Sequence, residues 1–250
     1  MNCAENKKNR NPVSLYFDCS SGISGDMVVA SLLDAGASKD KLMRGLESLG
    51  LDHVSLGVVP VSKNGVDALQ FRVEICRPSL AERNLDDIHA VIERADISPR
   101  ARELSKKIFR IAALSQATAH GCRVDEVLFH EKGAVDSLLD IVGTAVCIDD
   151  LRPVSIGASP LSEGTGHTRW KDMVFPVPAP AVRETVSRFS LPVRYTDICQ
   201  ELITPTGAAI AAALFEMFHS APPTPLRVGI GAGTREYGRG GVLKCLVLPN

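Results

Sequence analysis

Aromatic residues, net charge and long apolar runs are all scarce in this sequence, and each scarcity excludes a class of protein. Aromatic residues make up only 5% of the chain, which argues against the base-stacking surfaces of single-strand nucleic-acid binders. The formal net charge is −1, so bulk electrostatic attraction to nucleic acid or membranes is not expected. The longest wholly apolar run, 208–215, is far shorter than the roughly 20 residues of a transmembrane helix.

The seven cysteines contain no C-x-x-C pair and follow no regular spacing. This pattern argues against a zinc-finger site and favours reduced thiols in a cytoplasmic protein. Segment 1–12 is polar and lacks the apolar core of a signal peptide, so we expect it to be a disordered lead-in. Hydrophobic residues make up 45% of the chain, which is enough for one folded domain over 13–250.

The densest group of ionisable residues lies in F-H-E-K-G-A-V-D-S-L-L-D-I-V-G, at 129–143. Apolar positions recur there every three or four residues, which predicts an amphipathic helix with His130 and Glu131 just before its start. Asp136 and Asp140 lie four residues apart and share the other side of that helix. Their mutual repulsion would be relieved by a cation between them. Alternatively, Asp136 is the helix N-cap, Asp140 faces water and His130 is a hydrogen-bonded turn residue.

A Ser/Gly loop, C-S-S-G-I-S-G-D-M, follows the strand predicted at 13–17 and precedes a helix expected at 26–34. Backbone N–H groups at a helix start, together with the helix dipole, favour an anion such as phosphate. The loop is not a P-loop, because no Lys-Ser/Thr follows and its glycines are too close together. The alternative is a well-capped turn in which Ser24 is the N-cap. The candidate phosphate-binding residues are Ser20, Ser21, Gly22, Ser24 and Gly25.

The remaining chain predicts interspersed strands and helices without internal repeats. Asn64-Gly65 between two apolar runs predicts a hairpin, and region 54–78 is a candidate small lobe. Further helices are expected at 39–49, 85–94, 100–119, 180–189 and 205–218, with Ser98 as N-cap of the third and Thr204 as N-cap of the fifth. Further strands are expected at 154–156, 191–195, 226–230 and 242–248. The predicted fold class is α/β or α+β, with a single mixed-sheet domain flanked by helices.

Five segments, in this order, resemble the LarC family of nickel-insertion proteins. They are F-D-C-S-S-G-I-S-G-D-M (17–27), F-H-E-K-G-A-V-D-S-L-L-D-I-V-G (129–143), P-V-P-A-P-A (176–181), E-L-I-T-P-T-G-A-A (201–209) and G-A-G-T-R (231–235). Because they span nearly the whole chain, the resemblance implies the N-terminal portion of such a protein.

The resemblance implies a step in making the nickel-pincer nucleotide of lactate racemase. In that step a pyridinium bisthiocarboxylate mononucleotide receives nickel, a nickel–carbon bond forms and CTP is consumed. It also implies that CTP, with Mn or Mg, binds a C-terminal domain beyond Asn250. The sequence departs from the family where members usually carry histidines, at Leu128, at Asp172-Met173 and in E-R-N-L (82–85). These departures remove imidazoles, which suit nickel better than carboxylates do.

On this resemblance, the catalytic candidates are Asp136, Asp140 and Glu131. The metal candidates are His130, Glu131, Asp18 and Asp26. The chain is then a component of a CTP-dependent nickel insertase, a cyclometallase, and we expect a homo-oligomer with no nucleic-acid or membrane partner. One alternative is a non-catalytic metal or nucleotide carrier, or a scaffold subunit for a separate CTP-binding C-terminal domain. Another is an unrelated phosphate-dependent α/β enzyme, which fold alone does not exclude.

Overall fold

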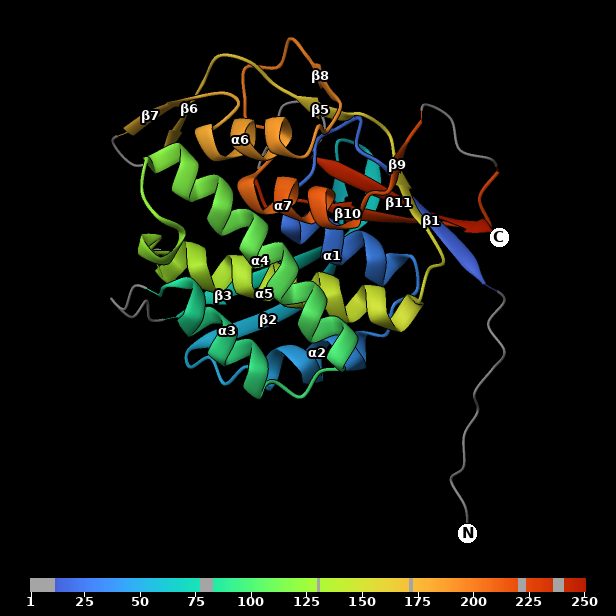
Figure 1. Ribbon diagram of the computed structural model, residues 1–250. Helices are drawn as coiled ribbons and strands as arrows, with labels where there is room; N and C mark the ends of the chain where they lie inside the picture. Colours follow the sequence, from blue (N-terminus) through green and yellow to red (C-terminus); the bar gives the residue numbers. More distant parts are fainter. Residues whose placement is uncertain (1–11, 77–82, 130, 171–172, 220–223, 236–240) are drawn as a thin grey trace.

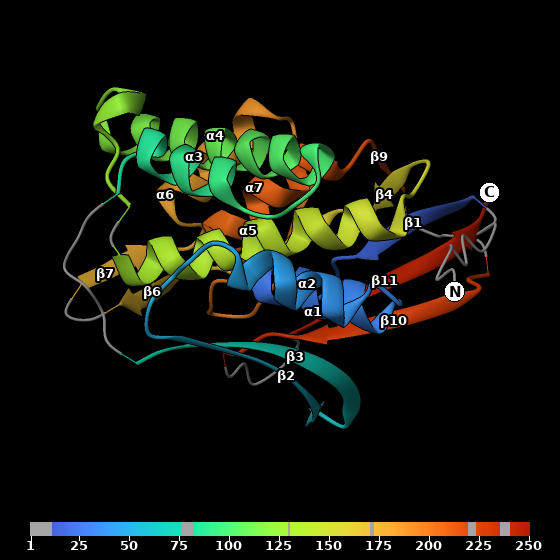
Figure 2. The same cartoon turned by 90° about the horizontal axis from the view of Figure 1, so that it is seen from below.

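A mixed sheet and the helices gathered on one of its faces make up the molecule (Figure 1; Figure 2). The computed structural model describes residues 12–76, 83–129, 131–170, 173–219, 224–235 and 241–250. Except for Pro12, the lead-in expected at 1–12 lies outside these ranges. The sheet has seven strands, and parallel and antiparallel neighbours are both present. The predicted class, a mixed sheet flanked by helices, is therefore confirmed.

The strands that are central in the sheet come from the two ends of the chain. In spatial order the strands are β2 (Val54–Lys63), β3 (Val66–Ile75), β10 (Arg227–Ala232), β11 (Val242–Pro249), β1 (Val13–Asp18), β4 (Ile156–Ala158) and β9 (Met217–Phe218). The β2–β3 hairpin turns at Asn64 and Gly65, whose φ angles of 51° and 77° are left-handed, as its Asn-Gly sequence predicts. Because Leu69 of β3 pairs with Gly231 of β10, the hairpin forms an edge of the main sheet.

The helices form two layers over the sheet (Figure 2). They are α1 (Gly25–Asp34), α2 (Lys39–Glu47), α3 (Leu85–Arg94), α4 (Pro99–His120), α5 (Glu131–Leu151), α6 (Pro180–Arg188) and α7 (Pro205–Leu214). Helix α1 packs on β3, β10 and β11, and α5 lies between the α1–α2 pair and α4. Because neighbours surround α5, most of its described side chains are buried, and its second half contributes to the core on every side.

The predicted caps of two helices are confirmed. The Ser98 hydroxyl accepts the N–H of Ala101 at 3.1 Å, and Pro99 occupies the first position of α4. Gly121 ends that helix in the left-handed conformation, with φ of 67°. Thr204 caps α7 in the same way as Ser98 caps α4.

Some predicted boundaries are wrong. Helix α5 begins at Glu131, so Asp136 lies inside the helix and is not its N-cap. Helix α7 ends at Leu214 instead of 218, because the Glu216 N–H donates to the Ile156 carbonyl at 2.9 Å and starts β9. The strand predicted at 154–156 is β4, which begins at Ile156. Sheet pairing, which a local pattern does not contain, explains the shift at 215–218.

The polar, Gly-rich segment 162–171, for which the sequence predicts no helix or strand, contains strands. β5 (Leu161–Glu163) pairs in parallel with β8 (Val193–Tyr195), and β6 (His167–Trp170) pairs with β7 (Met173–Pro176). A single 3-10 turn, η1 (Val124–Glu126), precedes α5. Across the described ranges, every helix is too short or too polar to cross a membrane.

Candidate functional site

The loop before α1 makes close contact with the segment before α7. Ile23 pairs with Ile203 as an isolated bridge, and its N–H donates to the Leu202 carbonyl at 2.9 Å. A Cβ added to Gly22 would lie closer than 3.0 Å to Leu202, and one added to Gly207 would lie equally close to Ile23. Glycine at these two positions therefore allows two backbones to touch, which is a structural reason for its presence.

Asp26 joins the start of α1 to the G-A-G-T-R segment (231–235). One carboxylate oxygen, Oδ2, accepts the Thr234 N–H at 2.8 Å and the Thr234 hydroxyl at 2.9 Å. The other oxygen, Oδ1, accepts the Met27 N–H at 2.9 Å and the Ser24 hydroxyl. Ser24 is thus the residue before the helix, as predicted, but its hydroxyl donates to Asp26 and does not cap the helix backbone.

Asp140 of α5 lies against the first turn of α1. A Cβ on Gly25 would come closer than 3.0 Å to the Asp140 side chain, so this glycine sets the distance between the two helices. Burial of the Asp140 carboxyl, and after it the charges of Asp26 and Asp136, raise its pKa well above the usual range, although the Asp26 backbone N–H donates to it. The carboxyl therefore favours its protonated form, and the Asp140 side chain is partly buried against α1.

The backbone donors at the start of α1 are engaged within the protein. The Asp26 N–H bonds Asp140, the Met27 N–H bonds the Asp26 carboxylate, and the Val28 N–H bonds the Ser24 carbonyl at 3.1 Å. A phosphate would compete with two carboxyl groups for these donors. The phosphate-binding hypothesis consequently depends on the outer part of the loop, where Ser20 is exposed and Ser21 is half-buried.

Asp18 lies at that outer part and is separately engaged. Its Oδ1 accepts the Ser20 N–H at 3.1 Å, and its Oδ2 lies 3.7 Å from the Lys244 ammonium. Lys244 is half exposed, and its ion pair with Asp18 brings a lysine to the carboxylate that binds the Ser20 N–H, a feature that the sequence pattern of β11 does not reveal. The outer loop thus offers hydroxyls and a cation to an anionic ligand.

The predicted metal set is not assembled by the described side chains. Within the ranges that the structure covers, no three His, Cys, Asp or Glu side chains group in a way that could hold a metal ion. His130 and the side chain of Glu131 lie outside the described part of the chain. The assignment of His130, Glu131, Asp18 and Asp26 as metal ligands therefore stays a prediction.

Two buried polar residues of the β2–β3 hairpin hold the 231–235 segment in place. The Lys63 ammonium donates to the carbonyls of Gly233, at 2.6 Å, and Arg235, and the Gln70 amide donates to Gly233 at 3.0 Å. The Arg235 guanidinium in turn pairs with Glu201 of the segment before α7. Sequence reasoning missed these residues, because lysine and glutamine in a hairpin strand give no signal of burial.

Glu163, at the end of β5, is a second acidic centre that the sequence did not indicate. Its side chain is fully buried, and its Oε1 accepts N–H groups of Gly164 at 2.8 Å, Leu202 at 2.7 Å and Ile203 at 3.3 Å. Burial raises the pKa of Glu163 to about 7, although these three hydrogen bonds oppose the shift. A buried carboxyl that titrates near neutrality is a common feature of functional sites.

Comparison with known proteins connects these features to one family. The family model described as nickel insertion protein matches residues 15–249. The chain is 41% identical to the pyridinium-3,5-bisthiocarboxylic acid mononucleotide nickel insertion protein of Alkaliphilus metalliredigens, over 94% of this chain and 60% of the relative. It is 38% identical to the protein of the same name from Acetivibrio thermocellus, over 93% of this chain and 60% of the relative.

A further relative is named only by its family. The putative nickel insertion protein of Rhodopirellula baltica is 43% identical, over 92% of this chain and 58% of the relative. The chain thus spans about three fifths of the length of these curated relatives. No solved structure matches the chain.

Proposed function

Because this chain belongs to the nickel insertion protein family, we propose that it takes part in inserting nickel into a pyridinium-3,5-bisthiocarboxylic acid mononucleotide. One observation carries the proposal: four of the five segments that resemble the family meet at the start of α1. The loop at 17–27 contacts 201–209 through Ile23, the 231–235 segment through Asp26 and α5 through Asp140. Such a meeting of distant segments is typical of a site.

We assign the ends of the substrate to different parts of this region. The Ser20 and Ser21 hydroxyls, with Lys244 paired to the nearby Asp18, suit the phosphate. Asp136, Asp140 and Glu131 are the catalytic candidates for handling nickel, with His130 as a nitrogen ligand. Imidazole suits nickel, whereas carboxylates alone would favour harder ions such as Mg²⁺ or Mn²⁺.

We place CTP and its Mn or Mg on a C-terminal domain that works with this one. No lysine of the P-loop type follows the Ser/Gly loop, and the α1 donors are engaged by Asp140 and Asp26. A reducing cytoplasm suits the six described cysteines, all of which are free. The product would be the nickel-pincer nucleotide that lactate racemase uses.

The second candidate function is a carrier or scaffold subunit without its own turnover. It is favoured by the departures from the family pattern at Leu128 and at Asp172-Met173, which remove imidazole groups that suit nickel. In that case the chain would bind the mononucleotide and present it to the C-terminal domain, which would contribute the nickel ligands.

The test is to incubate the chain with nickel(II), CTP, Mn²⁺ and the bisthiocarboxylate mononucleotide, with and without the C-terminal part of the A. metalliredigens relative. Mass spectrometry would detect the nickel-containing product, and chromatography would detect products of CTP hydrolysis. We expect the chain alone to bind the mononucleotide without hydrolysing CTP, and the product to form when both parts are present.

Different outcomes separate the candidates. If Asp136→Asn and Asp140→Asn variants of the chain retain mononucleotide binding and product formation, the chain is a scaffold. CTP hydrolysis by the chain alone would contradict the division between the two parts. Absence of product with both parts, while the full-length relative forms it, would contradict the proposed function.

A further inference from the structure

A cavity of about 200 Å³ lies between α6 and the β5–β8 pair, separate from the start of α1. Its walls are mainly apolar and include Val182, Val186, Val193 and Ile203. Tyr195, with 59% of its surface exposed, also lines it, so the cavity reaches the molecular surface. Ligand sites commonly combine such apolar walls with a few placed polar groups.

Glu163 supplies one such polar group. It lines the cavity, and its Oε2 is buried without a hydrogen-bond partner among the described residues, while Oε1 carries three backbone N–H bonds. A buried carboxylate oxygen without a partner is costly, and the cost is relieved by protonation, by water or by a bound cation or donor. A positively charged ligand beside Glu163 would supply that relief at neutral pH.

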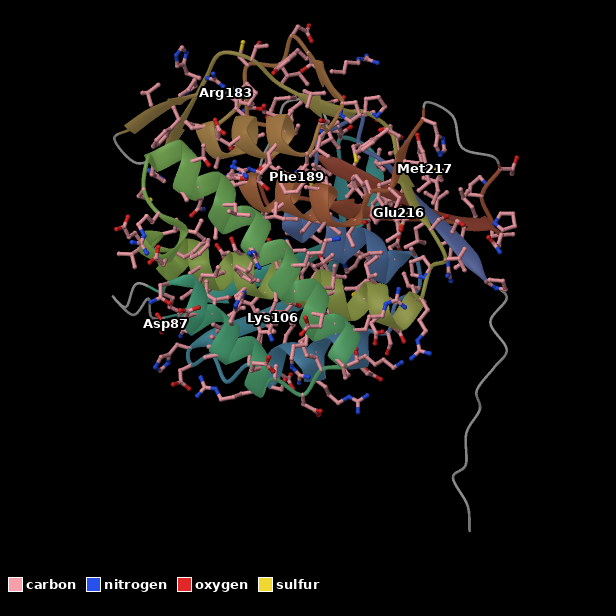
Figure 3. All side chains as sticks on the ribbon, viewed as in Figure 1. Asp87, Lys106, Arg183, Phe189, Glu216 and Met217 are labelled. Carbon is pink, nitrogen blue, oxygen red and sulfur yellow. The ribbon has the colours of Figure 1, made fainter. Side chains whose placement is uncertain are left out.

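Arg183 supplies a second polar group of opposite charge. It lies on α6 near the top of Figure 3, lines the cavity and is exposed. Its guanidinium forms no hydrogen bond or ion pair with any other residue that the structure describes. A free guanidinium suits a carboxylate or a thiocarboxylate, because its donors match the planar geometry of such groups.

We propose that this cavity holds the pyridinium ring of the mononucleotide, with Glu163 beside the positively charged ring and Arg183 bound to an acidic ring substituent. The inference rests on the proposed function and adds a position for the ring. Drug-sized ligands occupy pockets of roughly 300–1,000 Å³, so this cavity suits a substituted ring and leaves ribose and phosphate outside. The neutral-range pKa of Glu163, about 7, would fall when a cation binds beside it.

The ring site and the proposed phosphate loop are connected through one residue. The Leu202 N–H donates to Glu163 at 2.7 Å, and the Leu202 carbonyl accepts the Ile23 N–H of the loop. On the same side, the Ser162 N–H donates to the Cys19 carbonyl at 3.1 Å, directly before the two serines of the loop. A mononucleotide whose ring lies beside Glu163 therefore has a phosphate-binding candidate nearby.

The test measures whether binding depends on the charge of the ring. Calorimetric titration without nickel or CTP would compare nicotinic acid mononucleotide, a pyridinium, with its 1,4-dihydro form, whose ring is neutral. We expect the pyridinium to bind at least ~10-fold more tightly to the wild type, and Glu163→Gln to remove that preference. The matched control is Glu216→Gln, which removes the charge of an exposed glutamate beside β9 and should keep the preference (Figure 3).

A second variant keeps the inference testable if Glu163→Gln does not fold. Arg183→Gln changes only an exposed side chain and should reduce the preference for nicotinic acid mononucleotide over nicotinamide mononucleotide, whose carboxamide is neutral. If the pyridinium does not bind the wild type, or if Glu163→Gln keeps the charge preference, the cavity is not the site of the pyridinium ring. If nickel is inserted although either of these binding results is obtained, only the ring site is overturned. If the ring binds as expected but nickel is not inserted, only the proposed chemistry is overturned.

Discussion

Asp26 at the start of α1 and Glu163 beside α6 are both acidic side chains that accept backbone N–H groups, but they differ in what remains free. Both oxygens of Asp26 are engaged, with donors from Ser24, Met27 and Thr234. Glu163 uses one oxygen for three backbone donors, and its other oxygen is buried without a hydrogen-bond partner in the described part of the chain. The first carboxylate completes a connection within the protein, whereas the second keeps one oxygen that no described residue contacts through a hydrogen bond.

This difference shows that a segment rich in polar residues can have a structural role or a ligand-binding role. The segments at 17–27 and 231–235 are rich in Ser, Gly and Asp, a pattern that predicts ligand binding, yet many of those groups bind one another. Glu163 lies in the polar, Gly-rich segment 162–171, where the sequence predicted neither a strand nor a site. Hydrogen-bond satisfaction in three dimensions, and not residue type, distinguishes a structural carboxylate from one available to a ligand.

The strongest test of the first region is Gly22→Ala. Gly22 has a φ of 91°, and a Cβ there would come closer than 3.0 Å to the Leu202 carbonyl. Strain and overpacking should lower the free energy of unfolding by about 3 kcal/mol. Urea denaturation measures it, with Gly57→Ala as the control, because a Cβ at Gly57 has its nearest neighbour at 3.8 Å. Equal stabilities of the two variants would mean that Gly22 is present for a ligand and not for packing.

The pH dependence of stability tests the second region. Burial raises the pKa of Glu163 from its ordinary 4.5 to about 7. The protonated side chain therefore contributes its full share to the free energy of unfolding below pH 4.5, and this contribution is lost as pH rises through 7. Between pH 5 and 7 this loss is about 2 kcal/mol, and Glu163→Gln should abolish it. Urea denaturation at both pH values, with Glu216→Gln as the control, measures the difference. A variant whose stability falls with pH as steeply as the wild type would show that Glu163 is already ionised at pH 5.

Asp26→Asn should weaken the connection between α1 and the 231–235 segment. The amide of asparagine has only one acceptor oxygen. In either orientation, therefore, the donors of Thr234 or those of Ser24 and Met27 lose their acceptor. We expect a loss of about 1.5 kcal/mol, typical of a hydrogen bond to a charged group. Thermal unfolding measures it, and the control is Asp67→Asn, an exposed aspartate of β3. A loss no larger than in the control would mean that Asp26 is not a structural connection.

The smallest effect is expected for Lys106→Gln, far from both acidic centres. Lys106 of α4, labelled in Figure 3, pairs with Glu93 of α3, which is half exposed, so solvent screens the interaction. Unfolding temperature and the preference for the charged ring should both stay at their wild-type values. A shift in that preference would show that the ring site responds to charge at long range, which would weaken the conclusions from Glu163→Gln.

Local sequence patterns predicted those parts of the fold that neighbouring residues decide. The Asn64-Gly65 turn and the Ser98 and Thr204 caps were confirmed, because each depends on contacts within a few residues. The end of α7 was wrong, because β9 forms only when Glu216 reaches β4. The strands inside 162–171 were missed for the same reason, since β5 pairs with a strand about 30 residues later in the chain.

In the candidate site too, the local sequence predicted contacts within one helix but not contacts between distant segments. The spacing of Asp136 and Asp140 predicted that they share one side of a helix, but it did not indicate that Asp140 of α5 lies against the first turn of α1. Nothing in the local sequence indicated that Lys63 is buried or that Lys244 pairs with Asp18. These positions follow from pairing between strands that are distant in the chain.

The sequence by itself determined the α/β class, the helix caps, the hairpin turn and the set of segments that resemble one family. These features depend on hydrophobic period, on backbone conformations open to Gly, Asn and Pro, and on hydrogen bonds between near neighbours. The tertiary structure alone decided that the Asp26 carboxylate is satisfied by its own chain and that one oxygen of Glu163 has no hydrogen-bond partner among the residues described. Burial and the direction of donors from distant segments set these outcomes, and neither property is carried by a residue and its neighbours alone.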